Sequence, residues 1–377
     1  MEGFESVLMG VGYAGLKQAG NDILVVYLKD SRPASILFTK NYVKSESVLY
    51  TMQNFSGVLR ALVVNSGNAN CAVGSIGFEH AEMMAKRVAK NLGISQSEVA
   101  VFSTGIIGKP LDIDGVLRGI DSACFSLKPL DLKLASETIS TTDRFPKLHA
   151  IFRNGIYACG FAKGAGMIHP NMATMLAFMF LDAETNKLRE IHEITNEESF
   201  NSITVDGCTS TNDCSVLIST SSKSADDNLL TELIRELSLS LAKMIVLDGE
   251  GATKIIKVSV INASSKQRAR ALASLVANSN LVKAAIYGLD PNWGRIIAAL
   301  GSGSERVDIN KLSIKIGSHT VFDQKPLTPD SEMLLSYLKF NKEVLILIDL
   351  KEGNSEWSFY SSDLTPEYVN LNARYST

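Results

Sequence analysis

Cysteine pairs of the kind that bind zinc or build disulfide frameworks are missing from this sequence. The five cysteines are odd in number and none belongs to a CxxC pair, while the five histidines are scattered without HExxH spacing. Both patterns argue against a structural metal site and against a chain held together by disulfides. We therefore expect no metal and a reducing compartment.

Long apolar runs and a strong net charge are missing as well. The N-terminal segment has two early acids, no preceding basic stretch and only a short apolar run that glycines interrupt, so we expect neither a signal peptide nor a membrane span. A net charge of -3 gives no electrostatic reason to expect a nucleic acid or a membrane surface as partner. The expected location is cytoplasmic, and a small anionic or zwitterionic substrate stays open, because local charge and net charge are different quantities.

The composition is that of a globular protein, with 45% hydrophobic and 20% charged residues in a chain of 377. Such a length suits one large domain or two medium ones. Runs rich in Val and Ile, each bounded by turn residues, predict strands at 22–28, 34–40, 60–67, 99–105, 173–183, 214–220, 254–260, 312–317 and 343–350.

Three segments between these runs have helical periodicity. They span Gly77 to Leu92, Ser224 to Met244 with Asp227 completing a capping box, and Ser265 to Ile286. Strands and helices follow one another in mixed order rather than in regular alternation. This order favours an α/β fold of the α+β type, a layered sandwich of sheets and helices, over a doubly wound sheet.

The stretch KGAGMIHPNMATMLAF, residues 163–178, places glycines and a proline before Ala173-Thr174 and a strand-like run. A threonine hydroxyl is a weak nucleophile, but an N-terminal threonine has its own α-amine as the base. Thr174 would become N-terminal if its hydroxyl attacked the carbonyl of Ala173 and the resulting ester hydrolysed. An isolated Ala-Thr pair more often just begins a strand, so this hypothesis depends on the other motifs.

Other motifs admit both a structural and a chemical interpretation. In FSTGIIGKP, a strand runs into Ser103-Thr104-Gly105, which suits either an oxyanion hole or a glycine turn. The Asn-rich and Gly-rich VVNSGNANC, residues 63–71, is more typical of a loop. Glu250 in LDGEGATK is an acid on a tight turn after a helix, able to pair with a ligand ammonium. DPNWGR, residues 290–295, has the pattern of a surface turn.

In this order, the motifs resemble those of the ornithine acetyltransferases, also called bifunctional arginine-biosynthesis proteins, over nearly the whole chain. The matching segments are NSGNAN at 65–70, STGIIG at 103–108, TTDRFPK at 141–147, KGAGMIHPNMATML at 163–176, ITVDGCTSTND at 203–213, DGEGATK at 248–254, DPNWGR at 290–295 and the terminal NARYST.

The resemblance implies a self-processing acyltransferase similar in chemistry to the N-terminal-nucleophile hydrolases. Cleavage between Ala173 and Thr174 would give an alpha chain of residues 1–173 and a beta chain of 174–377, assembled as two of each. An acetyl group would pass from N2-acetylornithine to Thr174 and then to glutamate, in arginine biosynthesis. No cofactor is implied, although some members also take acetyl-CoA as a co-substrate.

The resemblance also implies roles for individual residues. Thr174 is the nucleophile, and Thr104 and Gly105 form the oxyanion pair. The implied substrate-binding residues are Lys163, Thr174, Glu250, Asn372, Thr377 and one of Thr141 and Thr142, of which Thr142 is preferred.

Three positions depart from the family pattern, namely Cys208 and Arg374, where acids are common, and Ala165, where serine is frequent. They bear on acceptor preference more than on the reaction. Two alternatives stay open: an N-terminal-nucleophile amidase or aminopeptidase with water as acceptor, and an uncut, non-catalytic binding protein.

Overall fold

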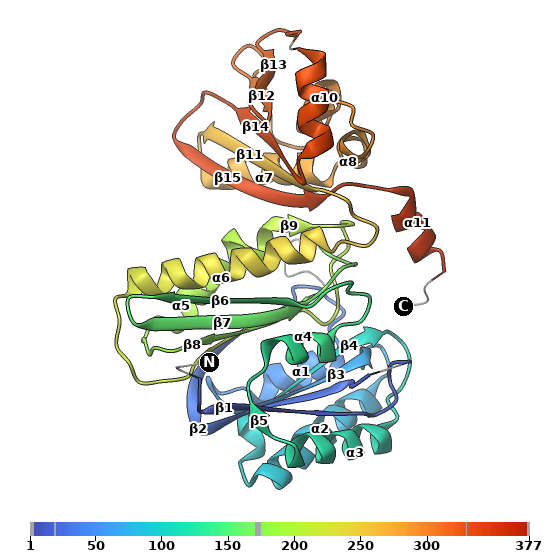
Figure 1. Ribbon diagram of the computed structural model, residues 1–377, viewed down its shortest axis with the longest axis vertical. Helices are drawn as coiled ribbons and strands as arrows, with labels where there is room; N and C mark the ends of the chain where they lie inside the picture. The colour runs from blue at the N-terminus through green and yellow to red at the C-terminus, as the bar shows by residue number, and fades with distance from the viewer. Residues whose placement is uncertain (1–3, 19, 170–174, 329, 375–377) are drawn as a thin grey trace.

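The computed structural model describes residues 4–18, 20–169, 175–328 and 330–374, and its strands form two sheets (Figure 1). The first sheet has nine strands, with β4-β3-β2-β10-β8-β7-β6 as its main order and β1 and β5 attached through β2. Their bounds are β1 (Val7–Gly12), β2 (Ile23–Phe38), β3 (Val58–Asn68), β4 (Val99–Ile106), β5 (Lys128–Pro129), β6 (Lys147–Arg153), β7 (Ile156–Lys163), β8 (Leu176–Leu181) and β10 (Cys214–Ser219).

Strand β2 folds this sheet into two facing layers. Its first half pairs with β1 and β3, whereas residues 34–38 pair with β10, and the register shifts between these halves. The two layers enclose a shared apolar core, in which the rings of Phe102 on β4 and Phe178 on β8 meet edge to face at 5.3 Å. Because the apolar side chains of the two layers pack against each other, the single sheet forms a sandwich.

Helices cover the outer face of each layer. Helices α2 (Ser75–Leu92) and α3 (Ile113–Phe125) pack on β1–β4, and α5 (Leu188–Glu198) and α6 (Asp227–Leu247) pack on the layer of β6–β8 and β10. The shorter helix α1 (Glu46–Asn54) packs beside α2, whereas α4 (Leu132–Ile139) packs on strands of both layers and adds Leu132, Ala135 and Ile139 to their shared core. There are 3₁₀ turns at Gln96–Glu98 and Phe200–Ser202. The result is the layered α/β sandwich that the sequence predicts.

The second sheet has six strands in the order β13-β12-β14-β11-β15-β9. These are β9 (Ile203–Thr204), β11 (Ile255–Ala263), β12 (Ser313–Ile316), β13 (His319–Asp323), β14 (Glu343–Asp349) and β15 (Ser355–Ser362). Helices α7 (Lys266–Asn278), α8 (Asn280–Tyr287), α9 (Trp293–Leu300) and α10 (Ser331–Phe340) pack on it, and α11 (Pro366–Asn372) reaches back toward the first sheet (Figure 1). Within the described residues, the helices are too short or too polar to cross a membrane.

Several predicted boundaries are wrong. Helix α6 begins at Asp227 rather than Ser224, because the Asp226 side chain accepts the N–H groups of Asn228 and Leu229 as its N-cap. The helix predicted for 265–286 is two helices, since Ser279 takes an extended conformation and caps α8. The runs 22–28 and 34–40 are one strand, β2. DPNWGR is only in part a turn, because α9 begins at its Trp293.

A buried histidine joins α5 to the first sheet and makes stability depend on pH. The His192 ring is fully buried, with Nδ1 2.9 Å from the Ser35 hydroxyl and Nε2 2.7 Å from the Ser215 hydroxyl. Burial lowers the pKa of His192 to about 3. The folded protein therefore keeps this ring neutral under conditions in which the unfolded chain protonates it.

We expect the free energy of unfolding to fall as pH drops below the ordinary histidine pKa of about 6.5, because the unfolded state then binds the extra proton. Between pH 7 and pH 5 this one group should remove about 2 kcal/mol. Urea unfolding at both pH values measures the loss. A His192→Gln variant should lose less over the same interval, and an identical pH dependence in both proteins would contradict the assignment.

Candidate active site

One cavity of about 160 Å³ gathers residues from seven separated parts of the chain. They come from the residue after β3, the end of β4, the segment after α4, the end of β7 with the residues that follow it, the segment between β9 and β10, the turn after α6, and α11. Seven residues that the sequence analysis singled out line this cavity: Thr104, Gly105, Thr141, Thr142, Lys163, Glu250 and Asn372. Ala173, Thr174 and Thr377 lie outside the described residues.

The end of β4 supplies Thr104 and Gly105. Parallel pairing with β3 sets Gly105 opposite Gly67, and Gly105 has a φ of +133°. A Cβ atom at Gly105 would lie 2.2 Å from the carbonyl carbon of Gly67, so no other residue fits there without moving the β3 backbone. The segment Ser103-Thr104-Gly105 thus continues the strand to Ile106 instead of turning.

Asn-rich segments fix the backbone around this strand end. Asn65 accepts a hydrogen bond from the Ser103 hydroxyl at 2.6 Å, and the Asn212 amide donates to the carbonyls of Ser103 and Ala69 at 2.8 and 2.6 Å. Asn65 and Asn212 are both buried. The interpretation of residues 63–71 as a loop is therefore wrong for its first six residues, because β3 continues to Asn68 through its pairing with β4. The role of NSGNAN is structural, and it holds the neighbouring strand beside the cavity.

Lys163, the last residue of β7, reaches the same strand end. Its side-chain ammonium lies 3.1 Å from the Thr104 hydroxyl, and the residue is only 4% exposed. Burial lowers the pKa of Lys163, while the charge of Asp143 opposes that shift. A buried cation is thereby placed beside the hydroxyl of the predicted oxyanion pair.

Glu250 lines the same cavity together with the C-terminal helix α11. Its carboxylate accepts a hydrogen bond from the Asn372 side chain at 2.9 Å, and its own N–H donates to the Ala165 carbonyl. The Thr365 hydroxyl also donates to the Gly251 carbonyl at 2.8 Å, which docks the start of α11 on the same turn. These contacts dock the C-terminal segment at the cavity as far as Asn372.

Both candidate threonines, Thr141 and Thr142, line the cavity, and the preference for Thr142 stays a prediction. The chain resumes after the undescribed 170–174 with Met175, whose N–H donates to the buried Asp213 carboxylate at 3.0 Å. Burial raises the pKa of Asp213 well above its usual value. A carboxyl group therefore lies next to the position that follows Thr174.

Sequence reasoning missed Asp206 and Tyr368 as cavity residues. Asp206 accepts the backbone N–H groups of Met167, Ile168 and Cys208 at 2.5, 2.9 and 3.1 Å, and burial raises its pKa. Asp206 could have been identified from the sequence, because it stands in the quoted VDGCTSTND motif. No sequence feature identifies Tyr368, because only the return of α11 brings it to the cavity.

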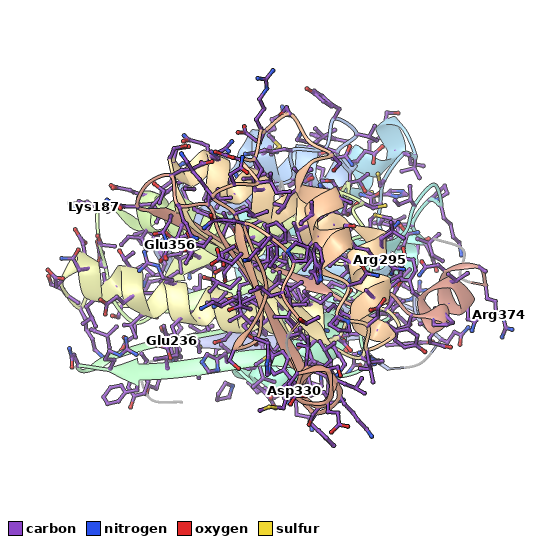
Figure 2. All side chains as sticks on the ribbon, turned by 90° about the horizontal axis from the view of Figure 1, so that it is seen from above. Lys187, Glu236, Arg295, Asp330, Glu356 and Arg374 are labelled. Atoms are coloured by element: carbon purple, nitrogen blue, oxygen red, sulfur yellow. The ribbon has the colours of Figure 1, made fainter. Side chains whose placement is uncertain are left out.

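Of the three departures from the family pattern, Cys208 and Arg374 line cavities, whereas Ala165 is buried and its carbonyl accepts the N–H of Glu250. Cys208 is exposed and lines the first cavity directly. Arg374 lines a neighbouring cavity of about 380 Å³, which shares Glu250 and Thr142 with the first. Figure 2 shows Arg374 at the margin of the molecule, beyond α11. Cys208 is thus the departure placed to touch a ligand in the first cavity.

The chain is similar to known proteins over nearly its whole length. The model of the ArgJ family matches residues 8–377. The arginine biosynthesis bifunctional protein ArgJ of Aquifex aeolicus is 53% identical over 98% of this chain and 99% of its own length. The glutamate N-acetyltransferase of Methanothermobacter thermautotrophicus is 37% identical over 98% of this chain and 96% of its own. The crystal structure of arginine biosynthesis bifunctional protein ArgJ from Bacillus halodurans is 35% identical with a TM-score of 0.50, covering 54% of this chain and 100% of that one.

Proposed function

The chain belongs to the ArgJ family, and we propose that it transfers an acetyl group from N2-acetylornithine to glutamate, a step of arginine biosynthesis. One observation carries the proposal: Thr104, Lys163 and Glu250 come from three separate elements and line a single small cavity. A hydroxyl, a buried cation and an opposing carboxylate suit a substrate that develops an oxyanion at one end and carries an ammonium at the other.

Self-cleavage would precede transfer. The Thr174 hydroxyl attacks the Ala173 carbonyl, the peptide bond becomes an ester, and water hydrolyses that ester to leave residues 1–173 and 174–377. The pairing of β7 with β8 and of β2 with β10 would keep the two chains together.

In the first half-reaction the new α-amine of Thr174 takes the proton as the hydroxyl attacks the acetyl carbonyl. Thr104 and Gly105 stabilise the resulting oxyanion, with the Lys163 ammonium beside them. The carbon–nitrogen bond breaks, the departing amine takes a proton, and ornithine leaves an acetyl ester on Thr174. Glu250 and Asn372 hold the side-chain ammonium of ornithine.

In the second half-reaction the amine of glutamate attacks the acetyl ester. The bond between the acetyl carbon and the Thr174 oxygen breaks, and this oxygen takes up the proton that the attacking amine gives off. N-acetylglutamate then leaves, and the Thr174 hydroxyl is restored. The ester intermediate divides an amide-to-amide transfer into two easier steps. Acetyl-CoA as an additional donor, an assembly of two alpha and two beta chains, and a cytoplasmic location belong to the same proposal.

The test is formation of N-acetylglutamate by the purified protein from N2-acetylornithine and glutamate, followed by mass spectrometry. Release of acetate at the same rate without glutamate would instead support the amidase alternative. The absence of any acetyl transfer or release would support the uncut binding protein.

Removing the charge of Glu250 tests its assigned role. In Glu250→Gln we expect KM for N2-acetylornithine to rise about tenfold to hundredfold, because a charged hydrogen bond is worth roughly 1.5–3 kcal/mol. KM for glutamate should not rise, since glutamate has no side-chain ammonium. Steady-state kinetics with each substrate varied in turn measures both values, and an equal rise in the two would contradict the role.

A further inference from the structure

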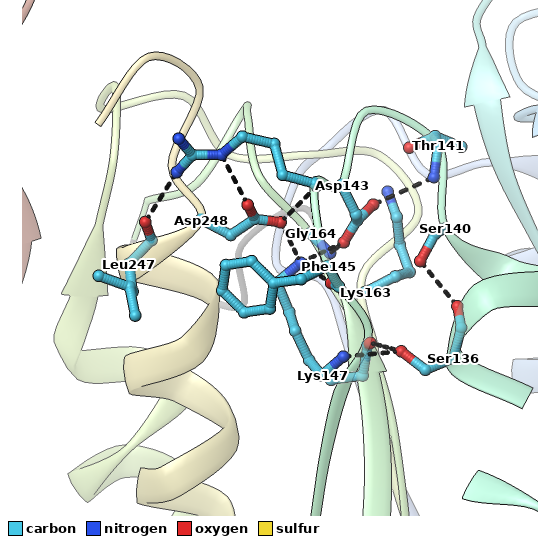
Figure 3. A network of polar contacts seen from close by, with 12 residues as sticks. Ser136, Ser140, Thr141, Asp143, Phe145, Lys147, Lys163, Gly164, Leu247 and Asp248 are labelled. Atoms are coloured by element: carbon cyan, nitrogen blue, oxygen red, sulfur yellow. Dashed lines mark hydrogen bonds and ion pairs between the residues drawn. The ribbon is translucent and has the colours of Figure 1, made fainter. Parts of the chain in front are cut away.

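A buried lysine outside the cavity connects three of the segments that form it. Lys147, the first residue of β6, has a side chain with no exposed area. Its ammonium lies 2.5 Å from Asp143 Oδ1 and 2.6 Å from Asp248 Oδ2, and these carboxylates are 1% and 0% exposed (Figure 3). The ammonium also lies 5.2 Å from the centre of the Phe145 ring.

The first carboxylate holds two of the cavity segments. Asp143 Oδ2 accepts the N–H of Thr141 at 3.0 Å, and Oδ1 accepts the N–H of Gly164 at 2.7 Å. Thr141 precedes Thr142, and Gly164 follows Lys163. The backbones next to two proposed substrate-binding residues are therefore attached to one side chain, which Lys147 holds in place.

The second carboxylate holds the third segment. Asp248 ends α6 as its C-cap residue, two positions before Glu250. Its Oδ2 accepts the N–H of Arg144 at 2.9 Å, and its Oδ1 accepts Nε of the same arginine at 2.9 Å. Arg144 also donates to the Leu247 carbonyl at 2.9 Å (Figure 3). The turn that carries Glu250 is thereby tied to the segment that follows Thr142.

Stability alone is a weak reason for this cluster. Three charges without solvent contact carry a large desolvation cost, and well-packed apolar residues are often equally stabilising in such places. Apolar contacts are not directional, whereas a carboxylate that accepts two N–H groups and one ammonium allows only a narrow range of positions for the backbones that donate to it. Catalysis needs binding groups whose positions vary this little.

We propose that Lys147 is a positioning residue of the transfer reaction, whose ammonium sets the relative placement of Thr142, Lys163 and Glu250 through Asp143 and Asp248. This inference rests on the proposed function, because it treats these three as the substrate-binding residues. Lys147 touches no substrate in this scheme. It acts through the two carboxylates.

The test compares Lys147→Met with a matched control, Lys223→Met. Lys223 pairs with the buried carboxylate of Asp182, which follows β8 at Leu181, the end opposite to Met175 and the cavity. Lys147→Met removes the ammonium from two buried carboxylates, those of Asp143 and Asp248, and Lys223→Met removes it from one, so both should lower the Tm. Lys147→Met should in addition raise KM for N2-acetylornithine by about tenfold to hundredfold, as expected for small misplacements of binding groups. Lys223→Met should leave KM unchanged.

Calorimetric titration with ornithine gives a readout independent of transfer, and weaker binding to folded Lys147→Met than to the unaltered protein would support the inference.

Asp143→Asn covers the case in which Lys147→Met does not fold, because asparagine keeps the shape of the aspartate side chain and removes its charge. The KM for N2-acetylornithine should again rise. Unchanged KM and ornithine affinity in the folded variants would overturn the positioning role while leaving the function intact. Absence of transfer by the unaltered protein would instead count against the function.

Discussion

Replacement of Thr174 by alanine is expected to leave one uncut chain of 40.8 kDa with no measurable acetyl transfer. The variant lacks the hydroxyl that attacks the Ala173 carbonyl, and so it never frees an α-amine to serve as the base. Loss of a nucleophile that acts together with its base costs about 10³-fold or more in kcat. Denaturing mass spectrometry of the variant beside the unaltered protein checks the first part, and the transfer assay checks the second.

Thr174→Ser is the control, because it keeps both a hydroxyl and, after cleavage, an N-terminal amine. It should be cut at the same bond and retain transfer. Two fragments from Thr174→Ala, breaking at the same bond, would refute self-cleavage by this residue. The prediction rests on the family resemblance and on the chemistry of an N-terminal threonine, since residue 174 lies outside the described part of the chain.

Thr104→Ala is expected to lower kcat by about 10²–10³-fold, the loss typical of removing one oxyanion donor. Thr104 is buried at the end of β4, and its hydroxyl lies 3.1 Å from the Lys163 ammonium. That cation favours negative charge on a neighbouring oxygen, so the pair suits an oxyanion that exists only in the transition state. KM should change little, and initial-rate kinetics separate the two constants.

Thr104→Ser preserves the hydroxyl and should retain most of kcat. A rise in KM with an unchanged kcat would show instead that Thr104 binds substrate in the ground state. Circular dichroism should find the same fold in both variants, because only one hydroxyl hydrogen bond is lost.

The sequence predicts the class of this fold well, because periodicity and turn residues act locally. Strands β4, β11 and β14 and helix α2 stand where Val-rich and Ile-rich runs and helical spacing place them. The hairpin of β6 and β7 was overlooked despite a strong local signal. Asn154 and Gly155 both have positive φ, at 50° and 80°, as the Asn-Gly turn of a hairpin requires.

Other features depend on tertiary contacts and could not be predicted from spacing. The register shift in β2 allows one strand to serve two sheet layers, and turn residues in the middle of the strand suggest two strands instead. Ser279 divides a continuous helical pattern because it caps α8. In both places packing overrides the local pattern.

The candidate site likewise contains residues that the sequence predicts and residues that depend on tertiary contacts. Motifs and the family resemblance predict seven of the seventeen residues that line the cavity. They do not predict the cluster around Lys147, although Asp143 and Asp248 stand in quoted motifs, because the two acids are joined only through tertiary structure. No spacing rule relates TTDRFPK to DGEGATK. Lys147 stands in the first of these motifs, and only the fold brings Asp248 of the second to it.

The central claim is that Thr174 carries the acetyl group, and the most direct test is the intact mass of the acid-quenched protein. The purified protein would be incubated with N2-acetylornithine alone and compared with a sample to which glutamate is then added. We predict a chain beginning at Thr174 that is heavier by one acetyl group and that loses it to glutamate as N-acetylglutamate. Turnover with an uncut chain, or an acetyl group on another residue, would contradict the account.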